Sequence, residues 1–463
     1  MKIRYIIVFI SYLLASSLQL TSSLHAQELL TLDDCLNMAL EHNNQTKIAG
    51  KNREIAKLDL KIYQSQYLPK LSLSGNYLYS NTSLEKTIQG GLLPTLSPDA
   101  SGNMVPNGGA AYFPDIPLEL KVNSIFNTSL MLSQPIYTGG KITSANKMAL
   151  IGNQMADLAE ELTTEEVILI CEQTYWNVIK SSSMVETASK YLETLQELER
   201  NVENAVNEGL AHNKDLLTVN VKVNEAILNM ARVQNAYKLS VMNLNHIIGL
   251  PLDTNTSIQK DYEVFSHEEL SQISIESRPE YQLLENQVKL NLQNEKIAKS
   301  ELLPTIGLAG AYSYTNGLEL NREKLMNGGN FAALVSLKVP LTHWGEFRNN
   351  LKKAQIKTDI SRIKKEEIAE QMYLEATMQY NKVKESLLEV KLTKAMVERA
   401  QENMDVCKDR YEAGMETLAS YLEAQTTLYK CRSEYISSQT NLNFNITTYK
   451  KAAGHTCPIP RIN

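Results

Sequence analysis

The chain contains the same series of landmarks twice, and this internal repeat constrains its fold more than any other feature. A Leu-Pro step before a Tyr-rich stretch ends at Pro69 and again at Pro304, 235 residues later. The landmarks that recur with a second offset of 205 residues are Pro135 with Pro340, Gly140 with Gly345, Tyr175 with Tyr380, Gly209 with Gly414, and Gly249 with Gly454. We therefore expect one unit written twice rather than several unrelated domains.

The change of offset places 30 extra residues in the first repeat, between Pro69 and Pro135. Residues 88–117 in that interval are rich in Gly and Pro and show no periodicity. Such a stretch predicts an enlarged loop. Apart from this loop, each repeat predicts the same order of elements: a helix, a strand, a connection, a second strand and a very long helix. A tight turn, which we call the tip, then leads into a returning helix.

Four stretches alternate apolar and polar residues with the period of a β-strand. They lie at about residues 71–80, 122–136, 306–314 and 331–339. About ten residues with this period is the length and pattern of a transmembrane β-strand. A half-buried strand of a soluble sheet gives the same pattern, so no single stretch decides between the two.

Long segments with 3/4 spacing of apolar residues predict coiled-coil helices. Residues 141–208 and 346–413 would each form a helix roughly 100 Å long, while 213–248 and 31–67 would each reach roughly 55 Å. Two short helices stacked end to end would match one long helix, with their join near Gly249 and the polar segment 253–279. The expected seams of the returning helices are Leu216, Val219, Val223, Ala226, Met230, Val233 and Tyr237 in the first repeat and Tyr421, Ala424, Leu428, Cys431, Tyr435 and Ser438 in the second.

The first 26 residues are predicted to be a cleaved signal peptide. Lys2 and Arg4 give the positive start, residues 6–14 are apolar, and Ala26 precedes a plausible cleavage point. The apolar run is too short for the alternative, an N-terminal membrane anchor. No Cys follows the cleavage point to accept a lipid. We therefore expect an exported protein.

Composition excludes several classes of protein. The 463 residues carry a formal net charge of −6, or −8 without Lys2 and Arg4, which argues against a basic nucleic-acid binder. No run of 18 apolar residues follows the leader, so membrane-spanning helices are not expected. Five Cys are spread singly and predict buried packing residues rather than a disulfide framework. Tyr (22) outnumbers Phe (7) and Trp (2), as a water–lipid interface would favour.

No motif predicts catalysis, a cofactor or a metal site. The stretch from Gly139 to Thr143 is only faintly similar to a phosphate loop, because it lacks the earlier Gly and a Ser or Thr directly after Lys141. The seven His show no metal-binding spacing. Glu165 and Glu166 fit the solvated face of a coiled coil better than an acid/base pair.

Four strands are too few to close a barrel, since barrels commonly contain about eight or more. An open sheet edge cannot stand in lipid, because its backbone groups would lack partners. Either the strands are soluble, or several chains pool them. Three copies would supply twelve strands and twelve packed long helices around a hollow middle, which suggests a conduit.

The mature chain, over roughly residues 29–454, resembles the TolC family of outer-membrane efflux proteins. The resemblance is carried by short motifs in a fixed order, each of them weak alone. They are Arg278-Pro279-Glu280 opening the second repeat, Leu303-Pro304 before the third strand, Ser133-Gln134-Pro135-Ile136 through Gly139-Gly140 after the second, Ile248-Gly249-Leu250-Pro251-Leu252 closing the first repeat, and the tips Asn207-Glu208-Gly209-Leu210 and Tyr411-Glu412-Ala413-Gly414.

This resemblance implies a mixed α+β membrane protein. It implies a trimeric 12-stranded β-barrel with four strands per chain, continued by a long α-helical coiled-coil tunnel with an equatorial belt at mid-height. The chain would comprise a first structural repeat at 27–250, an equatorial connection at 251–279 and a second repeat at 280–463.

The resemblance also implies a passive export channel in the outer membrane, with its helical tunnel in the periplasm and no catalytic centre or cofactor. It would be the exit duct of a tripartite efflux or secretion system. The implied partners are a homotrimer, a periplasmic adaptor (membrane fusion) protein, an inner-membrane pump and outer-membrane lipid, with no nucleic acid.

The resemblance places adaptor docking at the two tips. Gly209 and Gly414 end their long helices in the left-handed conformation that suits Gly. Leu210 and Met415 follow them and complete the expected docking surface. The expected N-caps of the returning helices are Asn213 and Thr417.

The resemblance also places the closure of the channel, its gate, at the tips. Asp215 and Tyr411 match a pair that joins the two tips in relatives. Ser420 and Glu423 match two Asp of an acidic ring, which here keeps one carboxylate per chain.

A second departure from the family pattern lies beside this pair. Lys214 and Glu416 stand where relatives have a Thr and an Arg. We hypothesise a gate ion pair of reversed polarity. The alternative is two solvated charges at helix ends, and an exposed pair contributes only ~0–1 kcal/mol.

Other functions fit parts of the sequence. A periplasmic coiled-coil scaffold or adaptor explains the helices but not the duplicated Tyr-rich strands, and a carboxylate-based hydrolase explains neither. Within the channel reading, we expect small-molecule efflux rather than a type I protein secretion duct. The sequence identifies neither the cargo nor the pump, and the segment 81–120 is expected to be extracellular and dispensable for insertion.

Overall fold

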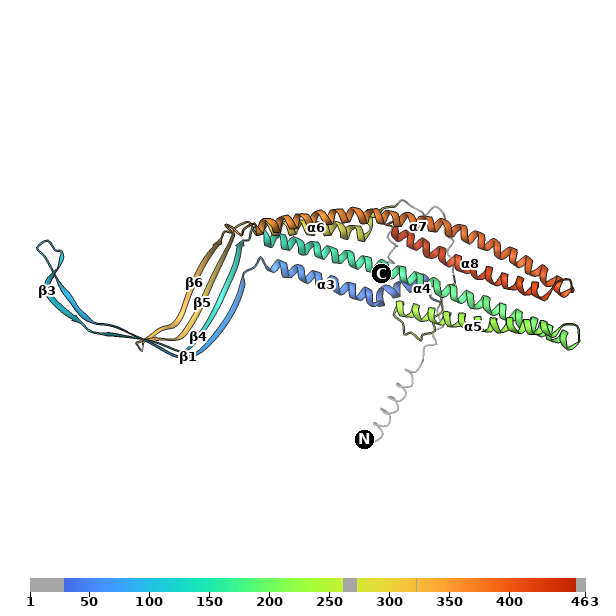
Figure 1. The fold of residues 1–463 in the computed structure, drawn as a ribbon, viewed down its shortest axis with the longest axis horizontal. Coiled ribbons are helices and arrows are strands. Elements are labelled where there is room, and N and C mark those ends of the chain that lie inside the picture. The colour runs from blue at the N-terminus through green and yellow to red at the C-terminus, as the bar shows by residue number, and fades with distance from the viewer. Residues whose placement is uncertain (1–28, 261–272, 322, 455–463) are drawn as a thin grey trace, which may run out of the picture. The chain divides into compact units, whose positions relative to one another are not determined.

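The computed structural model describes residues 29–260, 273–321 and 323–454 (Figure 1). The expected signal peptide lies outside these residues, as do Cys457 and part of the segment 253–279. The main elements in chain order are α2 (Leu32–His42), α3 (Asn44–Ser65), β1 (Lys70–Ile88), β2 (Gly91–Pro98), β3 (Met104–Phe113), β4 (Ile116–Tyr137), α4 (Lys141–Asn207), α5 (Asn213–Ile248), α6 (Pro279–Ser300), β5 (Thr305–Leu320), β6 (Glu323–Lys338), α7 (Glu346–Glu412) and α8 (Leu418–Ala452).

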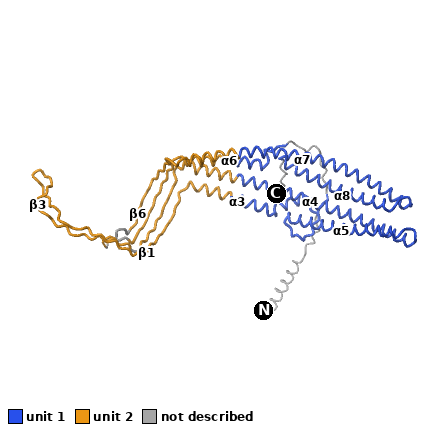
Figure 2. Tube along the Cα trace, viewed as in Figure 1, with its two compact units in different colours: residues 1–55, 154–287, 361–463 blue, residues 56–153, 288–360 orange. Residues whose placement is uncertain are grey.

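The chain divides into two compact units, and each contains parts of both sequence repeats (Figure 2). The first unit comprises residues 1–55, 154–287 and 361–463, and the second comprises 56–153 and 288–360. All the strands named above lie in the second unit, whereas the helical tips lie in the first.

Four strands of the second unit form an antiparallel sheet in the order β1-β4-β5-β6 (Figure 1). Leu73 lies opposite Leu130, Leu130 opposite Tyr312, and Tyr312 opposite Phe331. Directly opposed residues point to the same face, and all four of these side chains are exposed. The predicted strands are confirmed, and one face of the sheet carries a row of exposed apolar side chains.

A second sheet occupies the interval that the sequence predicted to be a loop, so that prediction was wrong. Over residues 88–117 the chain forms β2 and β3, which pair from Gly91 opposite Phe113 onward. Gly and Pro favour loops, but both strands of a two-stranded ribbon are edges. A proline such as Pro94 or Pro106 removes no ladder bond when its missing N–H would face the free side.

The long helices form as the sequence predicted. α4 and α7 each contain 67 residues, and α5 runs over the expected residues 213–248. Thr417 caps α8 by accepting a hydrogen bond from the Ser420 amide. Asn213 is not a cap, because His212 holds the N-cap position of α5 and Asn213 begins the helix. No helix in the described part of the chain is long and apolar enough to cross a membrane.

The helix predicted over residues 31–67 is broken in two at Asn43, which is a second correction. Asn43 adopts an extended conformation with ψ 135° between α2 and α3. Its side-chain oxygen accepts a bond from the Gln45 amide (2.8 Å), and its side-chain nitrogen donates to the Ile247 carbonyl (3.2 Å). The contact with α5 therefore fixes the break, although the local periodicity continues through it.

The first unit contains two main apolar cores. One joins α2, α4 and α5, and the other joins the α4–α5 hairpin to the start of α8. Their buried members include Cys35, Cys171, Leu244, Val219 and Tyr421. Val219 and Tyr421 belong to the predicted seams, which are confirmed at these two positions. The described cysteines are packing residues, with Cys407 only partly buried.

Candidate functional site

The two tips end their helices with the same local geometry. Gly209 and Gly414 have φ angles of 75° and 67°, in the left-handed region. Leu210 N donates to the Ala205 carbonyl, and Met415 N donates to the Arg410 carbonyl, each at 2.8 Å. These bonds satisfy the last helical carbonyls as in a Schellman turn.

Each tip presents a large apolar side chain to its surroundings. Leu210 is 78% exposed and Met415 is 67% exposed. Their backbone is held by the turn, so neither side chain is needed for the turn itself. The two tips therefore match in both their backbone turn and the exposed apolar side chain that follows the Gly.

The two hairpins pack against each other behind the tips. Val202 and Val219 from the first hairpin share a buried core with Leu418 and Tyr421 from the second. The ring of Tyr411 stacks on Tyr421 with centroids 5.3 Å apart and planes 16° apart. The tips of one chain are therefore held together mainly by apolar and aromatic packing.

Asp215 lies near enough to Tyr411 for its charge to act on the Tyr411 hydroxyl. Burial raises the pKa of the Tyr411 hydroxyl, and the nearby negative charge of Asp215 raises it further. Asp215 is half-buried in the first turn of α5. A neutral phenol can donate a hydrogen bond to a carboxylate, so the two side chains are chemically suited to pair.

The predicted partner of Glu416 is replaced within the single chain by Arg410. Arg410 Nε lies 3.7 Å from Glu416 Oε2, and the Thr417 amide donates to Glu416 Oε1 at 3.3 Å. Among the described residues, no ion pair joins Lys214 to Glu416, and Lys214 is exposed. Sequence reasoning missed Arg410, although a basic residue in the last turn of α7 is a typical partner for helix-end charges.

The two remaining predicted gate residues lie on the first turns of α8. Ser420 closes the cap of this helix, since its amide donates to Thr417 Oγ1 at 3.2 Å. Glu423 is exposed. Ser420 therefore has a local structural role, while the Glu423 carboxylate remains open to solvent in one chain.

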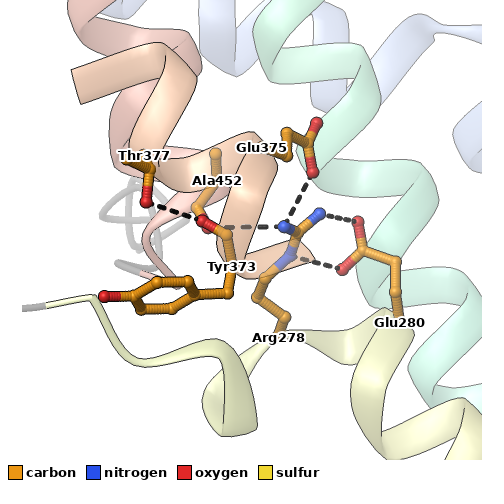
Figure 3. A network of polar contacts seen from close by, with 6 residues as sticks. All are labelled: Arg278, Glu280, Tyr373, Glu375, Thr377 and Ala452. Carbon is orange, nitrogen blue, oxygen red and sulfur yellow. Dashed lines mark hydrogen bonds and ion pairs between the residues drawn. The ribbon is translucent and has the colours of Figure 1, made fainter. Parts of the chain in front are cut away.

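A second polar site surrounds Arg278, which the sequence marked as a landmark without a role (Figure 3). Arg278 Nη1 lies 2.9 Å from Glu375 Oε2, and Nη2 lies 3.1 Å from Glu280 Oε1. Nη1 also donates to the carbonyl of Ala452 at 3.3 Å. The guanidinium thus ties the start of α6 to the middle of α7 and the end of α8.

The pKa values of two carboxylates near Arg278 are shifted in opposite directions. Desolvation alone would raise the pKa of Glu280, but its hydrogen bonds with Arg278 outweigh burial and lower it. Burial raises the pKa of Glu165, and the negative charge of Glu280 adds to the effect. Both groups belong to the first unit.

No group of three or more His, Cys, Asp or Glu side chains within residues 29–260, 273–321 and 323–454 is arranged to hold a metal ion. The polar sites described above are instead helix turns and ion pairs. They hold helices and helix ends together.

The sequence model of the family described as outer membrane efflux protein matches residues 35–250 and 270–455. Outer membrane protein TolC of Escherichia coli K12 is 21% identical over 429 residues, covering 89% of this chain and 80% of that protein. The solvent efflux pump outer membrane protein SrpC of Pseudomonas putida is 21% identical over 435 residues, covering 90% and 84%.

Solved structures show the same fold. The CmeC outer membrane channel of Campylobacter jejuni has a TM-score of 0.72 at 19% identity, covering 92% of this chain and 85% of that one. The outer membrane protein VceC of Vibrio cholerae has a TM-score of 0.72 at 14% identity, covering 91% and 96%. The resemblance inferred from the sequence motifs is confirmed, and the chain belongs to the outer membrane efflux protein family.

Proposed function

We propose that three copies of this chain form the outer-membrane exit duct of a tripartite efflux system. The observation that carries the proposal is the four-stranded sheet, whose edge strands β1 and β6 each pair on one side only. An edge in lipid needs a partner for its backbone groups. Pairing β6 of one copy with β1 of the next would provide that partner, and three copies would give a 12-stranded barrel.

The helices support assembly as well. Ile48, Ile55, Leu58 and Ile62 follow coiled-coil spacing along α3 and are each more than half exposed. A helix seam of this kind is stable in water only when a partner helix covers it. A second copy of the chain is the occupant we propose, because the same symmetry would close the sheet.

Assembly and location can be tested together by fractionation. The outer-membrane fraction should contain trimers that resist detergent and dissociate on heating. Soluble periplasmic protein would overturn the proposal and favour the alternative of a coiled-coil scaffold or adaptor. A heat-sensitive oligomer of another size in the outer membrane would contradict the twelve-stranded barrel but not the outer-membrane location.

The tips are proposed to dock the periplasmic adaptor. Leu210 and Met415 are exposed on ordered turns, and replacing each with a photoreactive residue should crosslink the adaptor in cells. Leu239, exposed on the same α5 helix but remote in sequence from the tip, is a matched control position. Crosslinks from Leu239 but not from the tips would overturn this assignment.

The cargo is proposed to be small molecules, carried passively while an inner-membrane pump supplies the energy. Relatives named for solvent, toluene and antibiotic efflux support this class over protein secretion. Deleting the gene should sensitise cells to such compounds without changing the secreted proteins. The reverse outcome would favour a type I secretion duct.

The gate proposal is tested by conductance of purified trimers in planar bilayers. Asp215→Ala and Tyr411→Phe should each raise the basal conductance, because each removes one side of the proposed contact. Glu166→Gln, an exposed charge change elsewhere on α4, is the matched control. Unchanged conductance in both gate variants would contradict the assignment.

The Lys214–Glu416 hypothesis requires its own comparison. If the two residues pair, Lys214→Glu and Glu416→Lys should each raise conductance, and the double swap should restore it. If Glu416 acts through Arg410 instead, Arg410→Ala should match Glu416→Lys and the double swap should not rescue. The second pattern would reject the reversed pair, and each effect should be small because exposed pairs contribute ~0–1 kcal/mol.

A further inference from the structure

The connection from β6 to α7 contains a Trp in a backbone conformation that side chains avoid. Trp344 has a φ of 50°, and Gly345 beside it has a φ of 88°. The Glu346 amide donates to the His343 carbonyl at 2.9 Å, which closes a tight turn with two left-handed central residues. Such turns strongly prefer Gly or Asn at both positions.

The first repeat shows what this turn normally contains. Its counterpart has Gly139 and Gly140 at φ 63° and 87°, and the Lys141 amide closes it by donating to Thr138. Gly139 occupies the position of Trp344 under the 205-residue offset. A Cβ on Gly139 would lie 2.8 Å from the Ser300 carbonyl oxygen, so the first turn has no room for a side chain.

The side chain of Trp344 receives no compensation from its own chain. It is 96% exposed, and Leu341 three residues earlier is 91% exposed. The ring of His343 packs on Phe347 at 4.0 Å, so the turn is ordered without the indole. A strained backbone that holds a large apolar side chain in solvent indicates a contact outside the chain.

Two further features of this region indicate the chemistry of that contact. Val335 and Leu337 alternate along β6, and Val339 follows its last residue. All three are more than half exposed, so the apolar face of the strand continues into Leu341. Immediately beyond the turn, Arg348, Lys352 and Lys353 are exposed on the first turns of α7.

An indole at the end of an apolar strand face, followed by basic side chains, is suited to the boundary between acyl chains and anionic headgroups. Long basic side chains can reach phosphate while their stems lie along apolar surface. Glu346 is the one carboxylate between Lys338 and Lys353, so the charge of this stretch complements an anionic surface.

We propose that Leu341 and Trp344 insert into the periplasmic leaflet of the outer membrane, with Arg348, Lys352 and Lys353 on its anionic phospholipid headgroups. This anchor rests on the proposed function, because it requires β6 to span the bilayer. The residue that the second repeat places in the left-handed turn thus fixes the depth of the strand–helix junction.

The two Trp of the chain allow a direct test. Trp176 is 4% exposed in the helical core and Trp344 is 96% exposed. The trimer is reconstituted in vesicles of phosphatidylethanolamine and phosphatidylglycerol, with or without phosphatidylcholine brominated near the headgroup end of its acyl chains. Subtracting the emission of Trp344→Phe from that of the unmodified protein isolates Trp344 without altering Trp176.

The anchor predicts blue-shifted Trp344 emission that shallow bromines quench strongly and bromines at the chain ends quench weakly. Blue-shifted emission that brominated lipid does not quench would place the indole against a neighbouring copy. Quenching by aqueous iodide would show that the indole is in water. Either result overturns the anchor while the trimer still floats with the vesicles and conducts. Failure to float or conduct would overturn the proposed duct as well.

The charge part of the anchor has a separate readout. Lys352→Glu with Lys353→Glu should reduce bromine quenching of Trp344 in vesicles that contain phosphatidylglycerol and leave it unchanged in phosphatidylcholine alone. Lys391→Glu with Lys394→Glu, exposed further along α7, is the matched control. Equal quenching in all three proteins would remove the anionic headgroup from the proposal.

Discussion

Arg278 keeps its charge on a side chain that is 7% exposed, and its bonds explain how the fold accommodates it. A buried cation is tolerated only when it is paired and hydrogen-bonded. Desolvation acts to lower the pKa of Arg278, but the bonds to Glu280 and Glu375 outweigh it and raise the pKa. The guanidinium is therefore a permanent charge that joins three helices (Figure 3).

Arg278→Ala should lower the free energy of unfolding by about 2–4 kcal/mol, because it leaves Glu280 without its partner. Thermal unfolding of the detergent-solubilised protein, followed by helical circular dichroism, measures the loss. Arg278→Lys keeps the charge but lacks the planar guanidinium that bonds both carboxylates. The stability of this variant should therefore fall between that of the natural protein and that of Arg278→Ala. Equal stability of all three proteins would show that the network contributes nothing.

Glu165 should oppose folding at neutral pH. Burial raises the pKa of Glu165 in the folded state, so the folded protein favours the protonated carboxyl. The stabilisation from protonating Glu165 is complete below the unfolded value of about 4.3 and is lost as pH rises through the folded pKa. Glu165→Gln should therefore raise Tm by roughly 1–2 °C at neutral pH and have no effect in acid. Glu166→Gln, its exposed neighbour, should leave Tm unchanged at both pH values.

Glu280 predicts the opposite dependence on pH. Its folded pKa is lowered by Arg278, so its stabilising effect is present above about 4.3 and is lost as pH falls through the folded pKa. The difference in Tm between the natural protein and Glu280→Gln should therefore shrink in acid. A constant difference across pH would show that the carboxylate acts by packing alone.

The helix ends show how far local sequence determines an element. Gly209 and Gly249 both have left-handed φ angles, of 75° and 79°, but their surroundings differ. A Cβ on Gly209 would meet nothing within 4 Å, whereas a Cβ on Gly249 would overlap with the side chain of His42 on α2. The first Gly is required by conformation alone, and the second by conformation and packing.

Gly209→Ala should destabilise the protein by about 1–2 kcal/mol, the strain of a left-handed non-Gly residue. Gly249→Ala should cost at least about 2 kcal/mol more, because α2 must also move. Urea unfolding of the two variants, followed by circular dichroism, gives the comparison. Similar losses of unfolding free energy in the two variants would mean that α2 can move at Asn43 without a measurable cost.

Most elements could be predicted because their signals are local and occur twice. The Pro and Gly landmarks located the strands and tips, and seam residues such as Val219 located the coiled coil. The break at Asn43 could not be predicted, because a carbonyl 204 residues away stabilises it. The ribbon of β2 and β3 was missed because Gly and Pro indicate loops wherever the number of neighbouring strands is unknown.

The contacts of the proposed gate residues were only partly predictable for a similar reason. Asp215 and Tyr411 are brought together by a core that both hairpins share, and the order of motifs was enough to expect it. The choice between Lys214 and Arg410 as partner of Glu416 depends on side-chain reach around the Gly414 turn. Sequence spacing does not encode that reach.

The ribbon of β2 and β3 should be dispensable for the molecule as a whole, because the two strands pair only with each other in their sheet. Replacing residues 91–113 by a short turn should leave trimer yield and conductance unchanged. Ala311→Pro is the contrasting variant, since β5 is hydrogen-bonded on both sides and a proline removes a ladder bond there. That variant should abolish insertion.

The position of the ribbon is checked on intact cells. If residues 81–120 are extracellular, an added protease should cut the natural chain within them and leave the shortened variant whole. Complete protection of the natural chain would place the segment elsewhere. Loss of trimers in the shortened variant would show that the ribbon takes part in assembly.

The unpaired edges of β1 and β6 have a consequence for how this protein must be made. Joining β6 of one chain to β1 of the next is a head-to-tail contact, and such a contact has no built-in end. Pairing of the two edges does not by itself limit the assembly to three copies. The curvature of the sheet and the packing of the helices must therefore stop the addition of further chains. A chain held in water before insertion, without a chaperone over its edges, will polymerise like a fibre instead of closing a ring.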